Sequence, residues 1–230
     1  MNSSQNDGIS ILLANRSYLY RLLQRIYADE PNSELMEIVT NDHTQEALGL
    51  ILEQEPEFEG YLDLLIKVRE AMKKDPEGTL DKLKSEYTYL FIGPNKLPAP
   101  PWESVYVTKE RLIFQESTLK VRQAYLEYKF LPKNYPHEAD DHLALELDFM
   151  AHLAGLAGEK FEEGKVEEAK KVLLDQKNFL EKHLLVWIGD FAEQIQESKT
   201  HYFYPQTAKL TARILKVDLD ALEEIISYLN

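Results

Sequence analysis

The chain of 230 residues carries 26 Lys and Arg against 40 Asp and Glu, a formal net charge of -14, and has no cysteine. The negative charge repels phosphate backbones and anionic lipid, so it argues against nucleic-acid binding and favours a basic or apolar partner. The lack of cysteine excludes disulfides, thiolate metal ligands and a cysteine nucleophile. The length is enough for one large domain that buries a sizeable core.

The first part of the chain predicts a series of amphipathic helices. After Gly8, apolar residues recur at steps of three and four until Asp29-Glu30-Pro31 interrupts the pattern, which is typical of one long helix. No stretch shows the alternation with a period of two that marks a strand. The next helices are expected at about 33–40, 44–54, 57–74 and 79–92.

A proline-rich segment then separates two helical halves. Residues 93–102 hold four prolines within eight positions, so this stretch cannot be helical and favours extended backbone. After it, helices are expected at about 109–130, 139–161, 165–182, 184–197, 205–216 and 218–229. The sequence predicts an all-α protein, a compact bundle of about ten helices with a proline-rich central loop. We interpret it as a single domain over residues 1–230, with subdomains 1–94 and 102–230 joined by that loop.

The hydropathy of the chain bears on the cellular compartment of the protein. The N-terminus lacks the basic start, long apolar core and small-residue cleavage site of a secretion signal. No apolar run approaches the roughly 18 residues that a membrane span needs. We therefore expect a cytoplasmic protein with no stable membrane insertion and no nucleic-acid partner.

One acidic stretch raises the question of a metal site. Glu138, His142 and Glu146 have the spacing that places side chains on one helix face, and carboxylate and imidazole ligands suit zinc or iron. Di-iron bundles use Glu-x-x-His pairs, however, and this sequence has none. The favoured interpretation is a helix start at which Asp140 and Asp141 complement the positive end of the helix dipole. No metal and no catalytic residue is predicted.

A nucleotide site receives little support. The stretch Gly158–Val166 briefly resembles a phosphate loop, yet five residues separate its glycines, it lacks the following Ser or Thr, and it follows a helix. A turn between two helices is the expected structure.

An apolar stripe leads into the proline-rich segment. Tyr87, Leu90 and Phe91 recur at helical spacing shortly before Pro101 and Trp102. Such a stripe belongs to the core, or else it forms a hydrophobic groove whose rim is made negative by nearby acidic residues. A groove of this kind suits a helix or an extended peptide with basic residues at one end.

Three motifs stand in order along the chain: Tyr87–Pro94 (YTYLFIGP), Pro98–Tyr106 (PAPPWESVY) and Glu138–His142 (EADDH). Further stretches that match are Phe114–Leu119, Leu145–Met150 and Phe179–Leu184. With the length, the helical pattern and the absence of cysteine, these motifs resemble the TorD/DmsD family of redox-enzyme maturation chaperones, most of all its DmsD-like branch. The resemblance covers most of the chain.

The resemblance implies a cytoplasmic, all-helical chaperone and not an enzyme. Such a chaperone binds the twin-arginine signal peptide, and in some relatives the catalytic subunit, of a molybdopterin oxidoreductase of the dimethyl sulfoxide or trimethylamine N-oxide reductase type. It delays export until the molybdenum cofactor is inserted. Relatives occur as monomers and as dimers that exchange helical halves, and some have been linked to guanine nucleotide, so GTP is the one cofactor the resemblance allows.

Carried over position by position, the resemblance assigns a set of peptide-binding residues: Tyr87, Leu90, Phe91, Pro101, Trp102, Ser104, Asp141 and His142. The apolar members would accommodate the apolar segment of the signal peptide. Asp141 would accept a charge-assisted hydrogen bond from one arginine, and His142 would orient that carboxylate.

The sequence departs from the family pattern at two positions. Ala139 stands where the family usually has proline, and Asn95 stands where some relatives carry an aromatic residue. Two other classes of function stay open on the sequence alone: a helical metal- or nucleotide-binding enzyme, and a helical scaffold without a peptide ligand.

Overall fold

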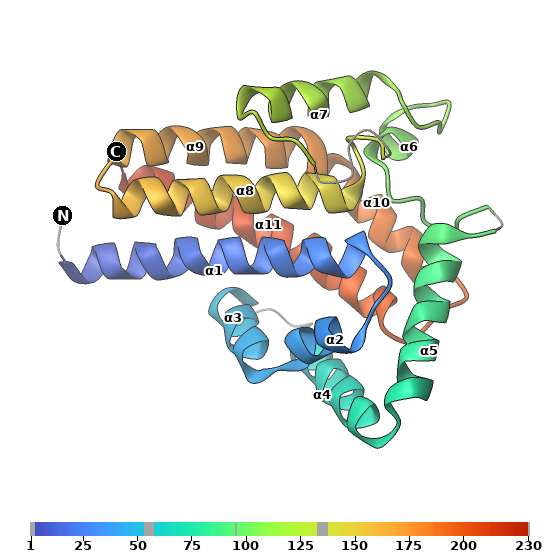
Figure 1. Cartoon of the computed structure of the whole chain (residues 1–230). Coiled ribbons are helices and arrows are strands. Elements are labelled where there is room, and N and C mark those ends of the chain that lie inside the picture. The colour runs from blue at the N-terminus through green and yellow to red at the C-terminus, as the bar shows by residue number, and fades with distance from the viewer. Residues whose placement is uncertain (1–2, 53–57, 95, 133–137, 230) are drawn as a thin grey trace.

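The computed structural model describes residues 3–52, 58–94, 96–132 and 138–229 (Figure 1). Every regular element in these ranges is helical, which confirms the all-α prediction. The α-helices are α1 (Ser3–Ala28), α2 (Ser33–Thr40), α3 (Asp42–Leu52), α4 (Phe58–Lys74), α5 (Pro76–Tyr87), α6 (Glu103–Val107), α7 (Glu116–Glu127), α8 (Leu143–Glu162), α9 (Val166–Phe179), α10 (Leu185–Gln196) and α11 (Tyr204–Tyr228). Two π-helical turns, η1 (Thr88–Ile92) and η2 (Leu180–Leu184), extend α5 and join α9 to α10.

The polar punctuation of the sequence sets several helix starts. The Asn32 side chain accepts a hydrogen bond from the backbone N–H of Leu35 at 2.9 Å and caps α2. Asp75 caps α5 in the same way through the N–H of Gly78 at 3.0 Å, and Pro76 takes the first helical position. These residue types satisfy backbone donors that a helix start leaves unpaired.

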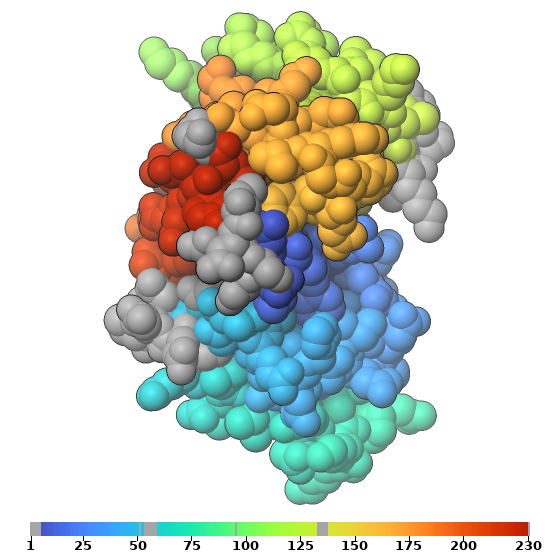
Figure 2. Space-filling view, turned by 90° about the vertical axis from the view of Figure 1, so that its left-hand side faces the viewer, coloured from blue at the N-terminus to red at the C-terminus, as the bar shows by residue number. Residues whose placement is uncertain are grey.

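The helices form three layers. α1 lies along α8, and α8, α9, α10 and α11 pack with it into the middle layer. Figure 2, seen from the end that carries the N-terminus, shows α7 as the top layer and α3 and α4 as the bottom layer. The first helix of the chain is thus packed among helices of the second half.

A buried ion pair fixes this arrangement. Arg16 of α1 donates to Asp218 of α11, with Nε 2.5 Å from Oδ1 and Nη2 2.9 Å from Oδ2. Arg16 also donates to Gln176 of α9 at 2.7 Å, and the hydroxyl of Tyr20 donates to Asp218 at 2.6 Å. Helices far apart in the sequence are therefore held together by charged and polar side chains within the core.

Several predicted helix boundaries are wrong, for identifiable reasons. The expected break near residue 217 is absent because Asp218 pairs with Arg16 and so stays inside the continuous helix α11. The expected helix at 109–130 begins only at Glu116, and a short helix, α6, precedes it. The helix expected from 139 begins at Leu143 with His142 as its cap, so Glu138 does not share a helix face with Glu146. No described helix is both long and apolar enough to cross a membrane.

Candidate functional site

The end of α5 supplies the aromatic part of the predicted site. Tyr87, Leu90 and Phe91 are all buried, Leu90 and Phe91 within the π-helical turn that extends α5. Their ring partners include Tyr27, which lies 6.1 Å from Phe91 between ring centroids, and Tyr204, which lies 5.3 Å from it. These three residues pack as core in this conformation, and their direct contact with a peptide stays a prediction.

The proline-rich segment is fastened to the acidic motif by backbone hydrogen bonds. The N–H of Leu143 donates to the carbonyl of Pro101 at 2.8 Å, and the N–H of Glu103 donates to the carbonyl of Asp141 at 3.0 Å. Trp102 therefore lies directly opposite His142, with their rings edge to face at 5.5 Å. The structure brings together two motifs that lie about forty residues apart in the sequence.

Glu138 completes this pair of rings. Its Oε1 accepts hydrogen bonds from Trp102 Nε1 at 2.9 Å and from the N–H of Ala139 at 3.0 Å. A proline at position 139 has no N–H, so the departure from the family pattern adds a donor that orients this carboxylate. Asn95, the other departure, lies outside the described residues.

Asp141 is occupied within the fold. It is 0% exposed, its Oδ2 accepts from the N–H of Ser104 at 2.8 Å, and its Oδ1 accepts from Thr118 Oγ1 at 2.9 Å. It thus joins the start of α6 to the start of α7. In this conformation it offers an arginine no free oxygen, and its direct contact with an arginine stays a prediction.

His142 caps α8. Its Nδ1 accepts from the N–H of Ala144 at 3.1 Å, and burial lowers the pKa of its imidazole, although the charges of Glu138 and Asp141 oppose this. A ring whose Nδ1 accepts is neutral and carries its proton on Nε2. The side chain is thereby a hydrogen-bond donor beside Glu138 and Trp102, and its role in orienting Asp141 stays a prediction.

Two carboxylates that the sequence argument did not single out lie close by. Burial raises the pKa of Tyr87, and the negative charges of Asp29, Glu30 and Glu138 raise it further. Asp29 and Glu30 are exposed at the end of α1, and Glu30 accepts from Thr88 Oγ1 at 3.0 Å. In the sequence this pair is recognisable only as a helix stop, because nothing local indicates that η1 lies beside it. We call Asp29, Glu30, Trp102, Glu138 and His142 the acidic mouth.

Beneath the acidic mouth lies a buried group of ionisable side chains. Oε2 of Glu103 is hydrogen-bonded to His183 Nδ1 at 2.9 Å, and Glu146 accepts from Trp187 Nε1 at 3.3 Å. Burial raises the pKa of Glu146, and the neighbouring charges of Glu103 and Asp141 raise it further. These side chains lie beneath the proline-rich segment that ends at Trp102, and they do not reach the surface.

The structure also bears on the hypotheses of a phosphate loop and of a metal site. Gly158–Val166 is the end of α8 and a turn into α9, with Gly164 at a φ of 74°, so the prediction of a helix-to-helix turn is confirmed. In the ranges that the structure describes, no three His, Asp or Glu side chains are grouped so as to hold a metal ion.

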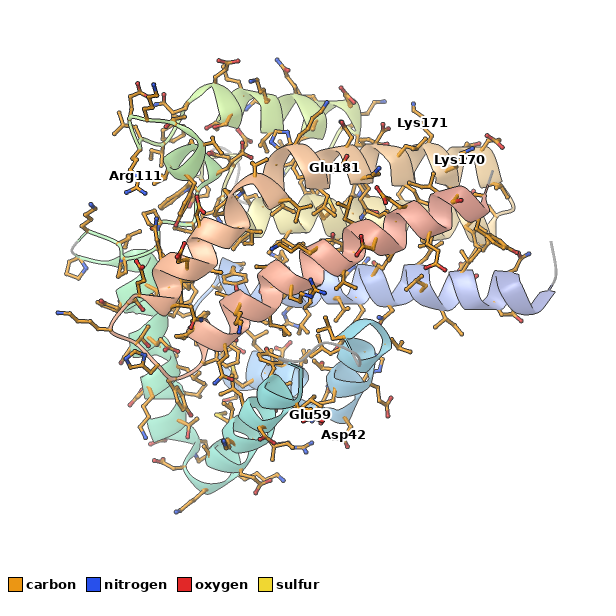
Figure 3. All side chains as sticks on the ribbon, turned by 180° about the vertical axis from the view of Figure 1, so that it is seen from behind. Asp42, Glu59, Arg111, Lys170, Lys171 and Glu181 are labelled. Atoms are coloured by element: carbon orange, nitrogen blue, oxygen red, sulfur yellow. The ribbon has the colours of Figure 1, made fainter. Side chains whose placement is uncertain are left out.

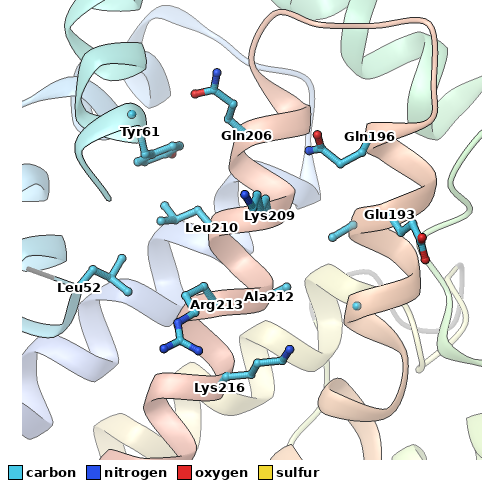
Figure 4. Close-up of a pocket in the computed structure, with 13 residues that line it drawn as sticks. Leu52, Tyr61, Glu193, Gln196, Gln206, Lys209, Leu210, Ala212, Arg213 and Lys216 are labelled. Atoms are coloured by element: carbon cyan, nitrogen blue, oxygen red, sulfur yellow. The ribbon is translucent and has the colours of Figure 1, made fainter. Parts of the chain in front are cut away.

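One cleft among the described residues lies away from this site. It has a volume of about 820 Å³ between α4, α10 and α11, and Figure 4 shows Lys209, Arg213 and Lys216 along one of its walls. None of the predicted peptide-binding residues lines it.

Comparison with known proteins identifies the family. Residues 54–193 match the family described as "Nitrate reductase delta subunit", which is more than half of the chain. The chain belongs to this family. Its curated relatives carry the names that the motifs of the sequence indicated, which confirms the predicted membership of the TorD/DmsD group. Members of this group are chaperones and not catalysts.

Individual members of the group show how far the similarity extends. The protein named "Probable Tat proofreading chaperone DmsD" of Haemophilus influenzae is 34% identical over 140 residues, which is 61% of this chain and 62% of that protein. "Chaperone protein TorD" of Shewanella pealeana is 28% identical over 215 residues, 90% of each chain. A redox enzyme maturation protein from Archaeoglobus fulgidus has the same fold, with a TM-score of 0.52, 21% identity, and coverage of 87% of this chain and 93% of that one.

Proposed function

We propose that this TorD/DmsD-type chaperone binds, in the cytoplasm, the twin-arginine signal peptide of a molybdopterin oxidoreductase of the dimethyl sulfoxide or trimethylamine N-oxide reductase type. By holding this leader it delays export until cofactor insertion and folding of the catalytic subunit are complete. The name of the Haemophilus relative, a Tat proofreading chaperone, supports the choice of the twin-arginine leader as ligand.

The observation that carries the proposal is the acidic mouth. Oε1 of Glu138 is held by Trp102 and Ala139, and among the described residues no donor reaches its Oε2. A carboxylate fixed in this way is suited to a charge-assisted hydrogen bond from a guanidinium, and the Trp102 ring offers that guanidinium an aromatic surface. Asp29 and Glu30 provide negative charge for the second arginine.

This assignment moves the arginine contact from Asp141 to Glu138. Asp141 then acts as a positioning residue, because its two hydrogen bonds hold Ser104 and Thr118 and so fix the segment that follows Trp102. His142 and Trp102 remain at the contact surface, while Tyr87, Leu90 and Phe91 are buried in the core.

The first test is calorimetric titration of the full chain with a twin-arginine leader peptide and with a control peptide in which both arginines are lysine. Lysine keeps the charge but loses the planar fork of donors, so we expect weaker binding of the control. Glu138→Gln should weaken binding of the arginine leader by about 1.5 to 3 kcal/mol, which is typical of a hydrogen bond to a charged group.

Glu167→Gln is the matched control. This substitution removes the same charge at another place, from an exposed carboxylate on α9. Equal losses in the two variants would mean that only net charge matters and would contradict a specific role for Glu138. Absence of binding by the unaltered chain would favour recognition of the mature catalytic subunit or a scaffold role. GTP binding is tested in the same instrument, and the turn at Gly158–Val166 gives it no structural support.

A further inference from the structure

The segment between α6 and α7 exposes an unusual run of apolar side chains. Leu112, Ile113 and Phe114 are consecutive and are 58%, 40% and 66% exposed, and Val107 before them is also exposed. We call residues 108–115 the apolar loop. Scattered exposed apolar residues need no explanation, but a contiguous exposed group indicates an interaction surface.

The backbone of the apolar loop is strained. Arg111 has a φ of 51° and Phe114 a φ of 62°, both in the left-handed region that side chains other than glycine rarely adopt. Such conformations persist where the surrounding structure enforces them, and they gather at binding sites. Here they present the side chain of Phe114 to solvent instead of folding it onto the core.

Both ends of the apolar loop are fastened to the acidic motif. Asp141 accepts from the N–H of Ser104 on one side of the loop and from Thr118 on the other. Thr108 Oγ1 donates to the carbonyl of Ser104 at 2.7 Å, and the N–H of Gln115 donates to Thr118 Oγ1 at 3.2 Å. The apolar loop and the acidic mouth are thus parts of one hydrogen-bonded unit, and they lie at the same end of the molecule (Figure 1).

The charges along this unit differ in sign. The acidic mouth has exposed Asp29 and Glu30, whereas the apolar loop carries Lys109, Glu110 and Arg111 and so has a net positive charge. Figure 3 shows Arg111 on this loop, at the end of the molecule opposite Lys170 and Lys171. A ligand with a basic head is attracted to the acidic mouth and not to the loop, so the charges favour one direction for its apolar part along the loop.

We propose that the apolar loop binds the apolar segment of the leader peptide whose arginines occupy the acidic mouth. The inference rests on the proposed function and adds to it a second contact surface and a direction. The leader runs from Glu138 and Trp102 towards Leu112 and Phe114. Asp141 acts here as a positioning residue that keeps the two contact surfaces at a fixed separation.

The test compares two peptides on the full chain: a complete leader, and a shorter peptide that ends after the arginines. The unaltered chain should bind the complete leader about tenfold or more tightly than the short peptide, because one or two large apolar side chains become buried. In the double variant Leu112→Ser/Phe114→Ser this preference should disappear, while binding of the short peptide stays the same.

Two further variants separate this interpretation from others. Ile11→Ser/Leu174→Ser removes apolar side chains that are 59% and 45% exposed on α1 and α9, and it should bind like the unaltered chain. Phe114→Gly relieves the left-handed strain, so it should be at least as stable to heat and still lose the preference for the complete leader.

Three outcomes would overturn the inference. The first is that the Leu112/Phe114 double variant keeps the full preference for the complete leader. The second is that the Leu112/Phe114 and Ile11/Leu174 double variants both lose this preference to the same extent. The third is a dimer in sedimentation that only the Leu112/Phe114 variant dissociates, which would make a second copy of the chain the occupant. Failure of the proposed function itself is distinguishable, because the unaltered chain would then bind neither peptide.

Discussion

At the scale of single residues, the acidic motif of the sequence divides into separate tasks once it is folded. Glu138 holds Trp102, Asp141 joins α6 to α7, and His142 caps α8. The residue types were predictable from the motif, but the tasks were not, because each depends on a partner distant in sequence. Asp29 and Glu30 show the same limit, since only the packing of α1 against η1 brings their charge to Tyr87.

Glu146 gives the clearest prediction for a single side chain. Its pKa is higher in the folded protein than in the unfolded chain, so the folded state holds the proton more tightly and stability falls as pH rises above the ordinary value of 4.5. Glu146→Gln keeps an acceptor for Trp187 and does not ionise. We expect it to be more stable than the unaltered chain at pH 8 and to lose this part of the pH dependence.

Urea unfolding between pH 5 and pH 8 measures this difference, with Glu167→Gln as the control at an exposed site. A parallel loss of stability with pH in Glu146→Gln and in the unaltered chain would show that another group is responsible.

At the scale of helices, periodicity and punctuation predicted most elements, and the errors have more than one physical cause. Where the chain lacks a proline or glycine, as between α9 and α10, the backbone continues through a π-helical turn instead of breaking. Where a helix starts without a local cap, the cap comes from elsewhere in the fold. α11 is the main example, because the N–H groups of Phe203 and Tyr204 donate to Glu86 at 2.7 and 3.0 Å.

Glu86 is therefore predicted to hold the start of α11 onto α5. Its buried carboxylate also accepts from the N–H of Tyr202 at 2.9 Å and from the Thr200 hydroxyl. Glu86→Gln replaces one acceptor oxygen by a donor that faces these N–H groups, so we expect a loss of about 2 to 3 kcal/mol in the free energy of unfolding. Thermal denaturation checks this, with Asp81→Asn on the exposed face of α5 as control. A change in melting temperature no larger than that of the control would contradict the capping role.

At the scale of the whole molecule, the fold joins the two halves of the chain more closely than the proline-rich segment suggests. The sequence indicated a boundary at residues 93–102, yet α1 packs along α8, and Arg16 pairs with Asp218 across the bundle. A dimer that exchanged the segment before this boundary would carry α1 into the partner and would have to form the same ion pair between chains. Sequence could not predict this pair, because nothing local connects positions 202 residues apart.

The energetics of this pair follow from its burial. Removing one partner leaves a buried charge without its counterion, so Arg16→Met or Asp218→Leu alone should cost about 3 to 5 kcal/mol. The double variant removes both charges, and although the Tyr20 hydroxyl loses its acceptor, the double loss should be smaller than the sum of the two single losses. A double-mutant cycle by urea denaturation measures this coupling. Additive losses would mean that α1 is held to α9 and α11 by apolar packing alone. Two chains could then exchange helical halves without forming the buried charge pair again.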